Sequence, residues 1–107
     1  MKLIMAIINN DDSQNVSNRL TKAGFHVTKM ATTGGFLMSG NSTFITGVEE
    51  EHVEEVIDII RTYSKRRKQM TPMNFAGGPN ALGSYPLEVT VGGATIFVLN
   101  VERFEQA

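Results

Sequence analysis

Cysteine is absent from this sequence, and only two of its 107 residues are histidines, His26 and His52. The first absence excludes disulfide bonds and thiolate metal ligands, and two histidines are too few for a convincing zinc or iron site. A strong charge of one sign is also missing, because 10 basic and 11 acidic residues leave a net charge of −1. The chain therefore has no general electrostatic attraction for a nucleic acid polymer or an anionic membrane.

Long hydrophobic runs are missing as well. The Met1–Asn9 opening contains one lysine and a short apolar run, which is typical neither of a secretory signal nor of a membrane span. We therefore expect a cytoplasmic bacterial protein without membrane insertion. A length of 107 residues, with 41% apolar and 20% charged residues, predicts one small globular domain over residues 1–107 with a modest core.

Hydrophobic periodicity predicts an α+β fold. Helical spacing predicts helices over Ser13–Ala23 and from Glu49 to about Tyr63, the second with Val56 and Ile60 on its apolar face. Alternating or short apolar runs predict strands at Leu3–Ile8, Phe25–Thr32, Asn41–Val48, Leu87–Val91 and Ala94–Val101. The order β-α-β-β-α-β, with the last element elaborated into a hairpin at Gly92-Gly93, is the ferredoxin-like arrangement. Its helices normally cover one sheet face and leave the other available for oligomer packing.

The segment Gln69–Pro86 differs from the rest of the sequence. It contains all three prolines, three glycines and no clear period. We interpret it as a long loop, and on sequence alone a passive connector and a ligand-responsive loop are equally acceptable.

The segment Ala31–Gly47 combines glycines, hydroxyl side chains and an amide around Phe36 and Leu37. Glycines allow close backbone approach, and neutral donors beside an aromatic ring suit a flat ligand such as a nucleotide. Composition alone still favours a glycine-rich loop between two strands. The basic run Lys65–Lys68 could contact phosphate, but a solvated helix end is the simpler interpretation.

The inventory of catalytic groups is poor. There is no thiol nucleophile, no serine stands in a nucleophile-elbow context, and the acidic residues cluster at helix starts. Gly40–Gly47 has glycines at P-loop spacing but no lysine follows them. We therefore predict no catalytic residue, no metal and no cofactor, and favour ligand binding over turnover.

Three ordered blocks of residues carry a family resemblance. They are Thr28–Leu37 followed by Gly40, Asn41 and Phe44; Tyr85–Leu99; and Phe104–Gln106. These blocks resemble the signature of the PII-like cyclic-di-AMP receptors, a family called PstA or DarA, essentially from end to end. The resemblance implies a homotrimer with a ferredoxin-like core and three ligand sites between neighbouring subunits.

The resemblance also implies which residues form the site. Carried over by motif position, they are Thr28, Gly35, Phe36, Leu37, Asn41, Gly47, Phe97 and Gln106. It assigns hydrogen bonding to Thr28 and Asn41, packing on adenine to the two phenylalanines and the leucine, and close backbone approach to the glycines.

Two departures from the family pattern affect these expectations. His26 stands where the family usually has an arginine that covers a base by cation–π stacking. Neutral imidazole stacks without a fixed charge, so affinity could fall or depend on pH. The segment from Thr71 to Gly83 replaces the family's loop pattern in part.

The leading hypothesis is thus a non-enzymatic receptor that binds cyclic-di-AMP and signals through loop rearrangement to an unknown downstream protein. One alternative is a PII-like trimer that binds a different adenine nucleotide, which the His26 departure allows. A third hypothesis is a small enzyme that acts on a nucleotide.

Overall fold

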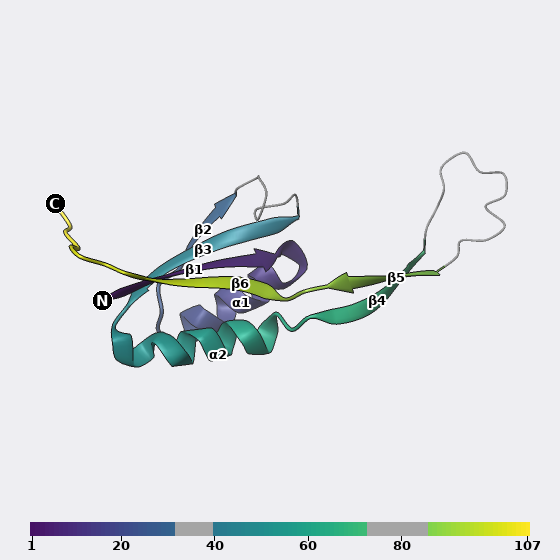
Figure 1. Ribbon diagram of the computed structural model, residues 1–107, viewed down its shortest axis with the longest axis horizontal. Coiled ribbons are helices and arrows are strands. Elements are labelled where there is room, and N and C mark those ends of the chain that lie inside the picture. Colours follow the sequence, from purple (N-terminus) through teal and green to yellow (C-terminus); the bar gives the residue numbers. More distant parts are fainter. Residues whose placement is uncertain (32–39, 73–85) are drawn as a thin grey trace.

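The computed structural model describes residues 1–31, 40–72 and 86–107. Its body is an antiparallel four-stranded sheet in the order β2-β3-β1-β6, with both helices on one face (Figure 1). The elements of this body are β1 (Lys2–Asn9), α1 (Asn10–Lys22), β2 (Thr28–Ala31), β3 (Asn41–Val48), η1 (Glu50–His52), α2 (Val53–Tyr63) and β6 (Ala94–Asn100). This small α+β arrangement is consistent with the predicted ferredoxin-like fold.

Helix α1 begins earlier than the periodicity predicts. The side chain of Asn9 accepts a hydrogen bond from the backbone N–H of Asp11 at 2.9 Å, so Asn9 is the N-cap. Asp11 and Asp12 then lie in the first turn, where negative charge favours the helix dipole. The cap residue is therefore the last residue of β1, and strand and helix follow each other without a linker.

The core lies between the helices and one face of the sheet. Ile4, Ala6 and Ile8 of β1 are at most 1% exposed, and Phe44 of β3 is 2% exposed. The helices contribute buried residues at helical spacing, which are Val16, Leu20, Val56 and Ile60. The predicted apolar face of the second helix is thus confirmed, and even-numbered residues of β1 and β3 point toward the helices.

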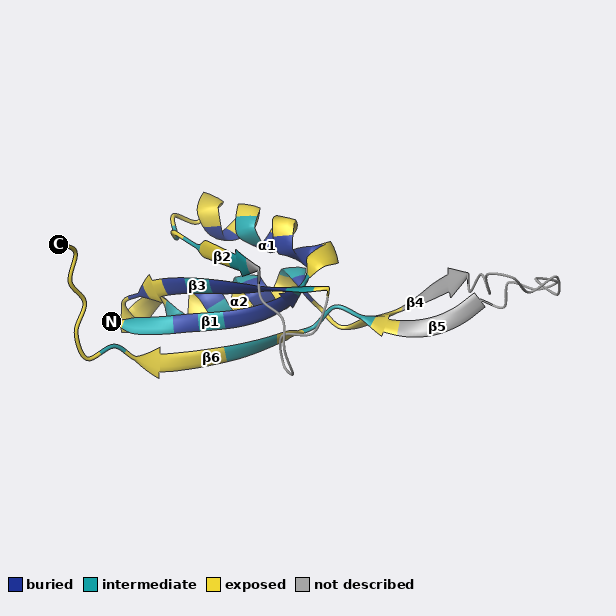
Figure 2. Cartoon of the chain, turned by 90° about the horizontal axis from the view of Figure 1, so that it is seen from above, coloured by how far each residue is buried: buried dark blue, intermediate teal, exposed yellow. Residues whose placement is uncertain are grey.

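The opposite face of the sheet carries the alternate residues of each strand. The register pairs Leu3 with Leu99 and Met5 with Phe97 across β1 and β6. Phe97 and Leu99 are 41% and 44% exposed, and the far end of β6 is exposed in Figure 2. We call this surface, away from α1 and α2, the open face.

Strand β2 begins later than predicted. Residues 25–27 precede β2, which starts at Thr28. Phe25 and Val27 pack against the core, and the carbonyl of His26 accepts a 2.7 Å hydrogen bond from the Thr46 hydroxyl. That side-chain bond replaces the backbone ladder at His26, which explains why alternation alone misplaced the strand start.

The predicted hairpin at Gly92-Gly93 is wrong. Strand β5 (Pro86–Val91) pairs with β4 (Arg67–Pro72) in a separate antiparallel ribbon, while β6 joins the main sheet beside β1. The ribbon extends away from the body (Figure 1). The predicted loop over Gln69–Pro86 is therefore strand at both ends, and residues 73–85 of it lie outside the described residues.

Gly92 and Gly93 form the junction between ribbon and sheet. Their φ angles are +82° and +81°, a region that favours glycine. A Cβ at Gly92 would lie 2.7 Å from Arg67 Nη1 and closer still to the carbonyl oxygen of Lys65. The Gly93 N–H donates to the Ser64 carbonyl. The two glycines thus let the chain change sheets where Gly93 is hydrogen-bonded to Ser64, the residue that caps the end of α2.

Candidate functional site

The strand register brings Thr28 and Phe97 into one row on the open face. Thr28 pairs with Ile45, Ile45 with Met5, and Met5 with Phe97. Cross-strand partners point to the same side, so a hydroxyl and an exposed aromatic ring stand at the two edges of one row. Three strand spacings separate them, about 14 Å.

Gly47 and Asn41 share that face but lie at opposite ends of β3. Gly47 pairs with Leu3, and Asn41 pairs with Asn9. Their six-residue separation along the strand corresponds to about 20 Å. The register therefore places four of the predicted residues on one surface without bringing them together at one point.

Nothing within the described chain requires glycine at position 47. A Cβ there would lie 3.6 Å from the sulfur of Met1, which is an ordinary contact. Gly47 is also exposed. The surface at Gly47 thus has space for a side chain. At Gly92, by contrast, an added Cβ would lie too close to Lys65 and Arg67.

Asn41 borders a small polar cavity of about 130 Å³ between the open face and the ribbon. Ile7 and Thr95 line it from the sheet, and Arg66 and the Gly92–Ala94 junction line it from the ribbon side. A positive guanidinium therefore lies near the predicted amide ligand. Sequence reasoning missed Arg66 because it assigned the basic run to the end of a helix, whereas α2 ends at Tyr63.

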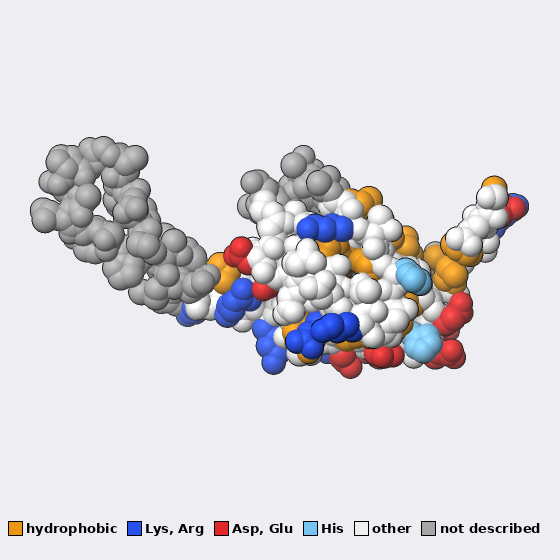
Figure 3. Space-filling model, turned by 180° about the vertical axis from the view of Figure 1, so that it is seen from behind, with side chains coloured by type: hydrophobic (Ala, Val, Ile, Leu, Met, Phe, Trp, Pro, Cys, Tyr) orange, Lys and Arg blue, Asp and Glu red, His pale blue; other side chains and the backbone are white. Residues whose placement is uncertain are grey.

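His26 lies near the other end of β3, where a hollow of about 520 Å³ is lined by His26, Gly47, His52 and two glutamates. Both histidines appear at one end of the molecule, with acidic side chains beside them (Figure 3). Glu49 and Glu55 are 62% and 55% exposed. Because carboxylates repel phosphate, this hollow suits an uncharged base better than an anionic group.

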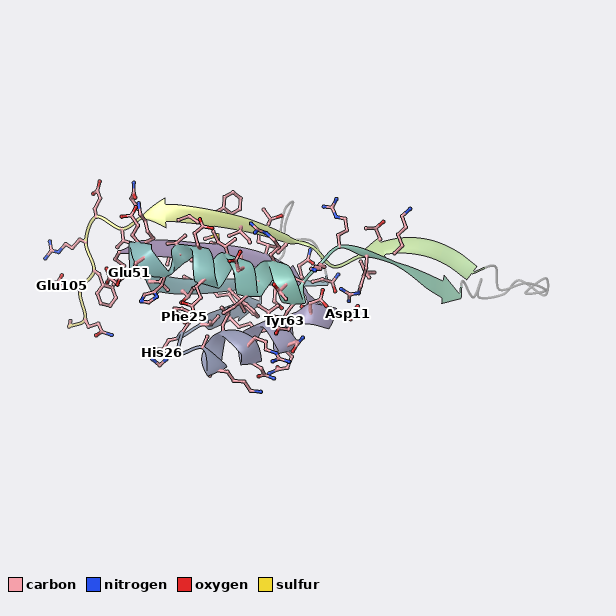
Figure 4. The ribbon with its side chains drawn as sticks, turned by 90° about the horizontal axis from the view of Figure 1, so that it is seen from below. Asp11, Phe25, His26, Glu51, Tyr63 and Glu105 are labelled. Carbon is pink, nitrogen blue, oxygen red and sulfur yellow. The ribbon has the colours of Figure 1, made fainter. Side chains whose placement is uncertain are left out.

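His52 has one acidic partner in its own element, η1, and another in the first turn of α2. Its imidazole lies 3.8 Å from Glu51 and 3.6 Å from Glu55, measured between nitrogen and carboxylate oxygen. Its ring also packs edge-on against Phe25, with centroids 5.8 Å apart. Figure 4 shows Phe25, His26 and Glu51 grouped at this end of the molecule.

Of the remaining predicted residues, the structure describes Gln106 alone. Gln106 is exposed in the tail after β6, next to Glu105, which lies at the His26 end of the molecule in Figure 4. Gly35, Phe36 and Leu37 lie outside the described residues.

A charged link lies at the root of the ribbon. Arg67 donates to both carboxylate oxygens of Asp12, at 3.0 and 3.1 Å. The hydrogen bonds that Arg67 donates to Asp12, and then the negative charge of Asp12, raise the pKa of Arg67 above its ordinary value. Lys and Arg side chains gather where the ribbon leaves the body (Figure 3).

Two features bear on the class of site. Across residues 1–31, 40–72 and 86–107, no cluster of three or more His, Cys, Asp or Glu side chains could hold a metal ion. Within those same ranges, no helix is both long and apolar enough to span a membrane.

Comparison with known proteins identifies relatives over the whole chain. The model of a family described as cyclic-di-AMP receptor matches residues 1–107. The chain is also similar to a protein of unknown function from Pediococcus pentosaceus whose crystal structure has been solved. The two sequences are 40% identical, with a TM-score of 0.77, over 99% of this chain and 96% of the other.

Proposed function

This chain belongs to the cyclic-di-AMP receptor family, and we propose that it binds cyclic-di-AMP as a non-enzymatic signal-transduction protein. The proposed sites lie between neighbouring subunits of a PII-like homotrimer in the bacterial cytoplasm. One observation carries the proposal: Thr28, Asn41, Gly47 and Phe97, which the family motif marks as ligand residues, share the face that the helices leave open.

The spread of these residues supports a site shared between subunits. Asn41 and Gly47 lie about 20 Å apart on β3, so one small ligand does not contact all four positions in a single subunit. Packing a second copy against the open face brings residues from different ends of the sheet together. It also buries Phe97 and Leu99, which are 41% and 44% exposed in the isolated chain.

The residue types suit a cyclic dinucleotide with two flat bases and two phosphates. Thr28 and Asn41 supply neutral hydrogen-bonding groups, and Phe97 supplies a flat apolar surface. Gly47 leaves surface space without a side chain, although the fold of the subunit does not require glycine there. Arg66, beside the Asn41 cavity, adds positive charge for a phosphate. Gly35, Phe36, Leu37 and Gln106 complete the proposed site.

We further propose that ligand binding shifts the arrangement of the loop that connects β4 and β5. A downstream protein would then recognise the favoured arrangement. Such a shift requires that the ligand bind one arrangement more tightly than the other. The cavity between Asn41 and the ribbon junction supports this idea, because it joins a proposed ligand residue to the root of the ribbon that carries the loop.

Isothermal titration calorimetry tests the ligand. We expect saturable heat with cyclic-di-AMP at micromolar concentrations and one site per subunit. Light scattering on the same sample should give the mass of a trimer. Absence of heat at these concentrations would exclude cyclic-di-AMP as the ligand, whatever the oligomeric state.

A different adenine nucleotide is the second candidate, and His26 is the observation that favours it. The imidazole lines the hollow beside Gly47 without the fixed charge of an arginine. Competition with ATP and cyclic-di-GMP distinguishes the two candidates, because the true ligand displaces the others. Recovery of unchanged ligand after long incubation separates both from a nucleotide-acting enzyme.

A further inference from the structure

The first turn of α1 contacts two segments that are distant in sequence. On one side, the backbone N–H of Asn10 donates to the carbonyl of Gly40 at 2.7 Å. The side-chain oxygen of Asn10 also accepts a 2.6 Å hydrogen bond from the Ser42 hydroxyl. Gly40 and Ser42 flank Asn41, so this turn holds the β3 end that carries the proposed amide ligand.

On the other side, the same turn holds the root of the ribbon. Asp12, two residues after Asn10, is 7% exposed and accepts both hydrogen bonds from Arg67. A largely buried carboxylate is costly without a charged partner, so Asp12 and Arg67 are expected to stay paired. Arg67 also donates to the carbonyl of Lys65 at 3.2 Å, which ties it to the turn after α2.

Arg67 lies close to the junction between the ribbon and the main sheet. A Cβ at Gly92 would lie 2.7 Å from Arg67 Nη1, and the N–H of Gly93 donates to the carbonyl of Ser64. The guanidinium is therefore packed against the junction between β5 and β6. Displacement of Asp12 would therefore break the bidentate ion pair or move the guanidinium that lies against this junction.

We propose that the first turn of α1 couples the Asn41 end of β3 to the root of the β4–β5 ribbon, with Asp12 as a positioning residue. The contacts run from Gly40 and Ser42 to Asn10, then along the helical turn to Asp12 and Arg67. The biological role of this coupling, which is to transmit the effect of ligand binding at Asn41 to the ribbon, rests on the proposed function. The coupling itself is a property of the ligand-free protein.

Amide hydrogen exchange on the ligand-free protein tests this coupling from both ends. Ser42→Ala removes the hydroxyl bond to Asn10, and Arg67→Gln removes the ion pair at its exposed partner. We expect Ser42→Ala to speed exchange in β4 by about fivefold, and Arg67→Gln to speed exchange at residues 41–43 by a similar factor. If either variant folds poorly, Asp12→Asn weakens the same ion pair from its buried side and provides a further test.

Matched controls separate coupling from general loosening. Thr46→Val removes another buried hydroxyl on the helix side of β3, the one that donates to His26, and should leave β4 exchange unchanged. Asp11→Asn removes a charge from the same helical turn without breaking the Arg67 bond. The proposal would be overturned if each substitution changed amide exchange only near its own site. It would also be overturned if the control variants changed exchange in β4 as much as Ser42→Ala does.

A second arm adds cyclic-di-AMP. Ligand should slow exchange in β4 of the unaltered protein and of Asp11→Asn, and this response should fall to less than about half in Asp12→Asn. An unaltered protein that binds no cyclic-di-AMP contradicts the proposed function, while the ligand-free arm still decides the coupling. Ligand binding with a full β4 response in Asp12→Asn contradicts the coupling and leaves the proposed function standing.

Discussion

Alanine at Gly92 would place a methyl group against the root of the ribbon. Its Cβ would meet the carbonyl oxygen of Lys65 and lie 2.7 Å from Arg67 Nη1. The arginine is flexible and could move aside, but the carbonyl belongs to the backbone after α2. The φ of +82° adds strain of its own for any residue with a side chain.

The expected loss of stability follows from these two effects. A left-handed backbone costs an L-residue about 1–2 kcal/mol, and overpacking a filled site typically costs about 1–3 kcal/mol. Gly92→Ala should therefore lower the free energy of unfolding by about 2–5 kcal/mol. Gly24→Ala is the matched control, because Gly24 has a φ of +95° but no atom within 4 Å of the added Cβ. It should show the backbone cost alone.

Urea denaturation of both variants, at one fixed protein concentration, measures the difference. The concentration must be fixed because the proposed trimer assembly would contribute to apparent stability. We expect a lower midpoint for Gly92→Ala than for Gly24→Ala at similar m-values, which would indicate a change in stability rather than in compactness. Equal losses in the two variants would refute the inference that contact with Lys65 and Arg67 requires glycine at position 92.

Three further substitutions test the proposed site. Asn41→Ala should weaken cyclic-di-AMP binding by about 1–3 kcal/mol in calorimetry while the trimer persists; unfolding would instead make Asn41 a structural residue. His26→Arg should strengthen binding by about 0.5–2 kcal/mol through cation–π stacking, and unchanged affinity would remove His26 from the base-binding hollow. Leu99→Glu should convert the proposed trimer to monomer in light scattering, whereas Val98→Glu should not, because Val98 is also 44% exposed but points to the opposite side of β6. Equal disruption by both would argue against assembly through the open face.

Much of the body of the fold follows from periodicity. Leu3–Ile8 predicted β1, which extends one residue further at each end. Val56 and Ile60 predicted the buried face of α2 and are 0% and 1% exposed. These predictions succeed because each element buries one apolar stripe against a single core, and the spacing of that stripe depends only on local geometry.

The ribbon could not be predicted in the same way. Arg67–Pro72 is a polar strand that ends in proline, so it lacks the alternation by which a strand is recognised. Gly92-Gly93 has the composition of a hairpin turn, and both residues do have positive φ. Alternation in Leu87–Val91 predicts a strand but does not identify its partner. Pairing with β4 instead of β6 depends on contacts at the end of α2 that only the fold supplies.

The candidate site has a similar division between local and tertiary information. Motif resemblance supplied Thr28, Asn41, Gly47 and Phe97, and the register then puts all four on the open face. No periodicity could assign them to one ligand, since they lie up to about 20 Å apart on the sheet. The proposed site between copies would explain both facts, because a second subunit could bring opposite ends of the sheet together.

Arg66 shows why charge must be judged after the helix boundary is known. At the end of a helix, a basic run favours the dipole and needs no ligand. Helix α2 ends at Tyr63, however, and Arg66 lines the same small cavity as Asn41 and the Gly92-Gly93 junction. A phosphate at Asn41 would therefore place negative charge next to the ribbon root, one residue from the Arg67–Asp12 pair. Under the proposed function, electrostatic attraction between the ligand and Arg66 would act at the root of the ribbon, and it is the simplest physical origin for the proposed ligand-dependent loop arrangement.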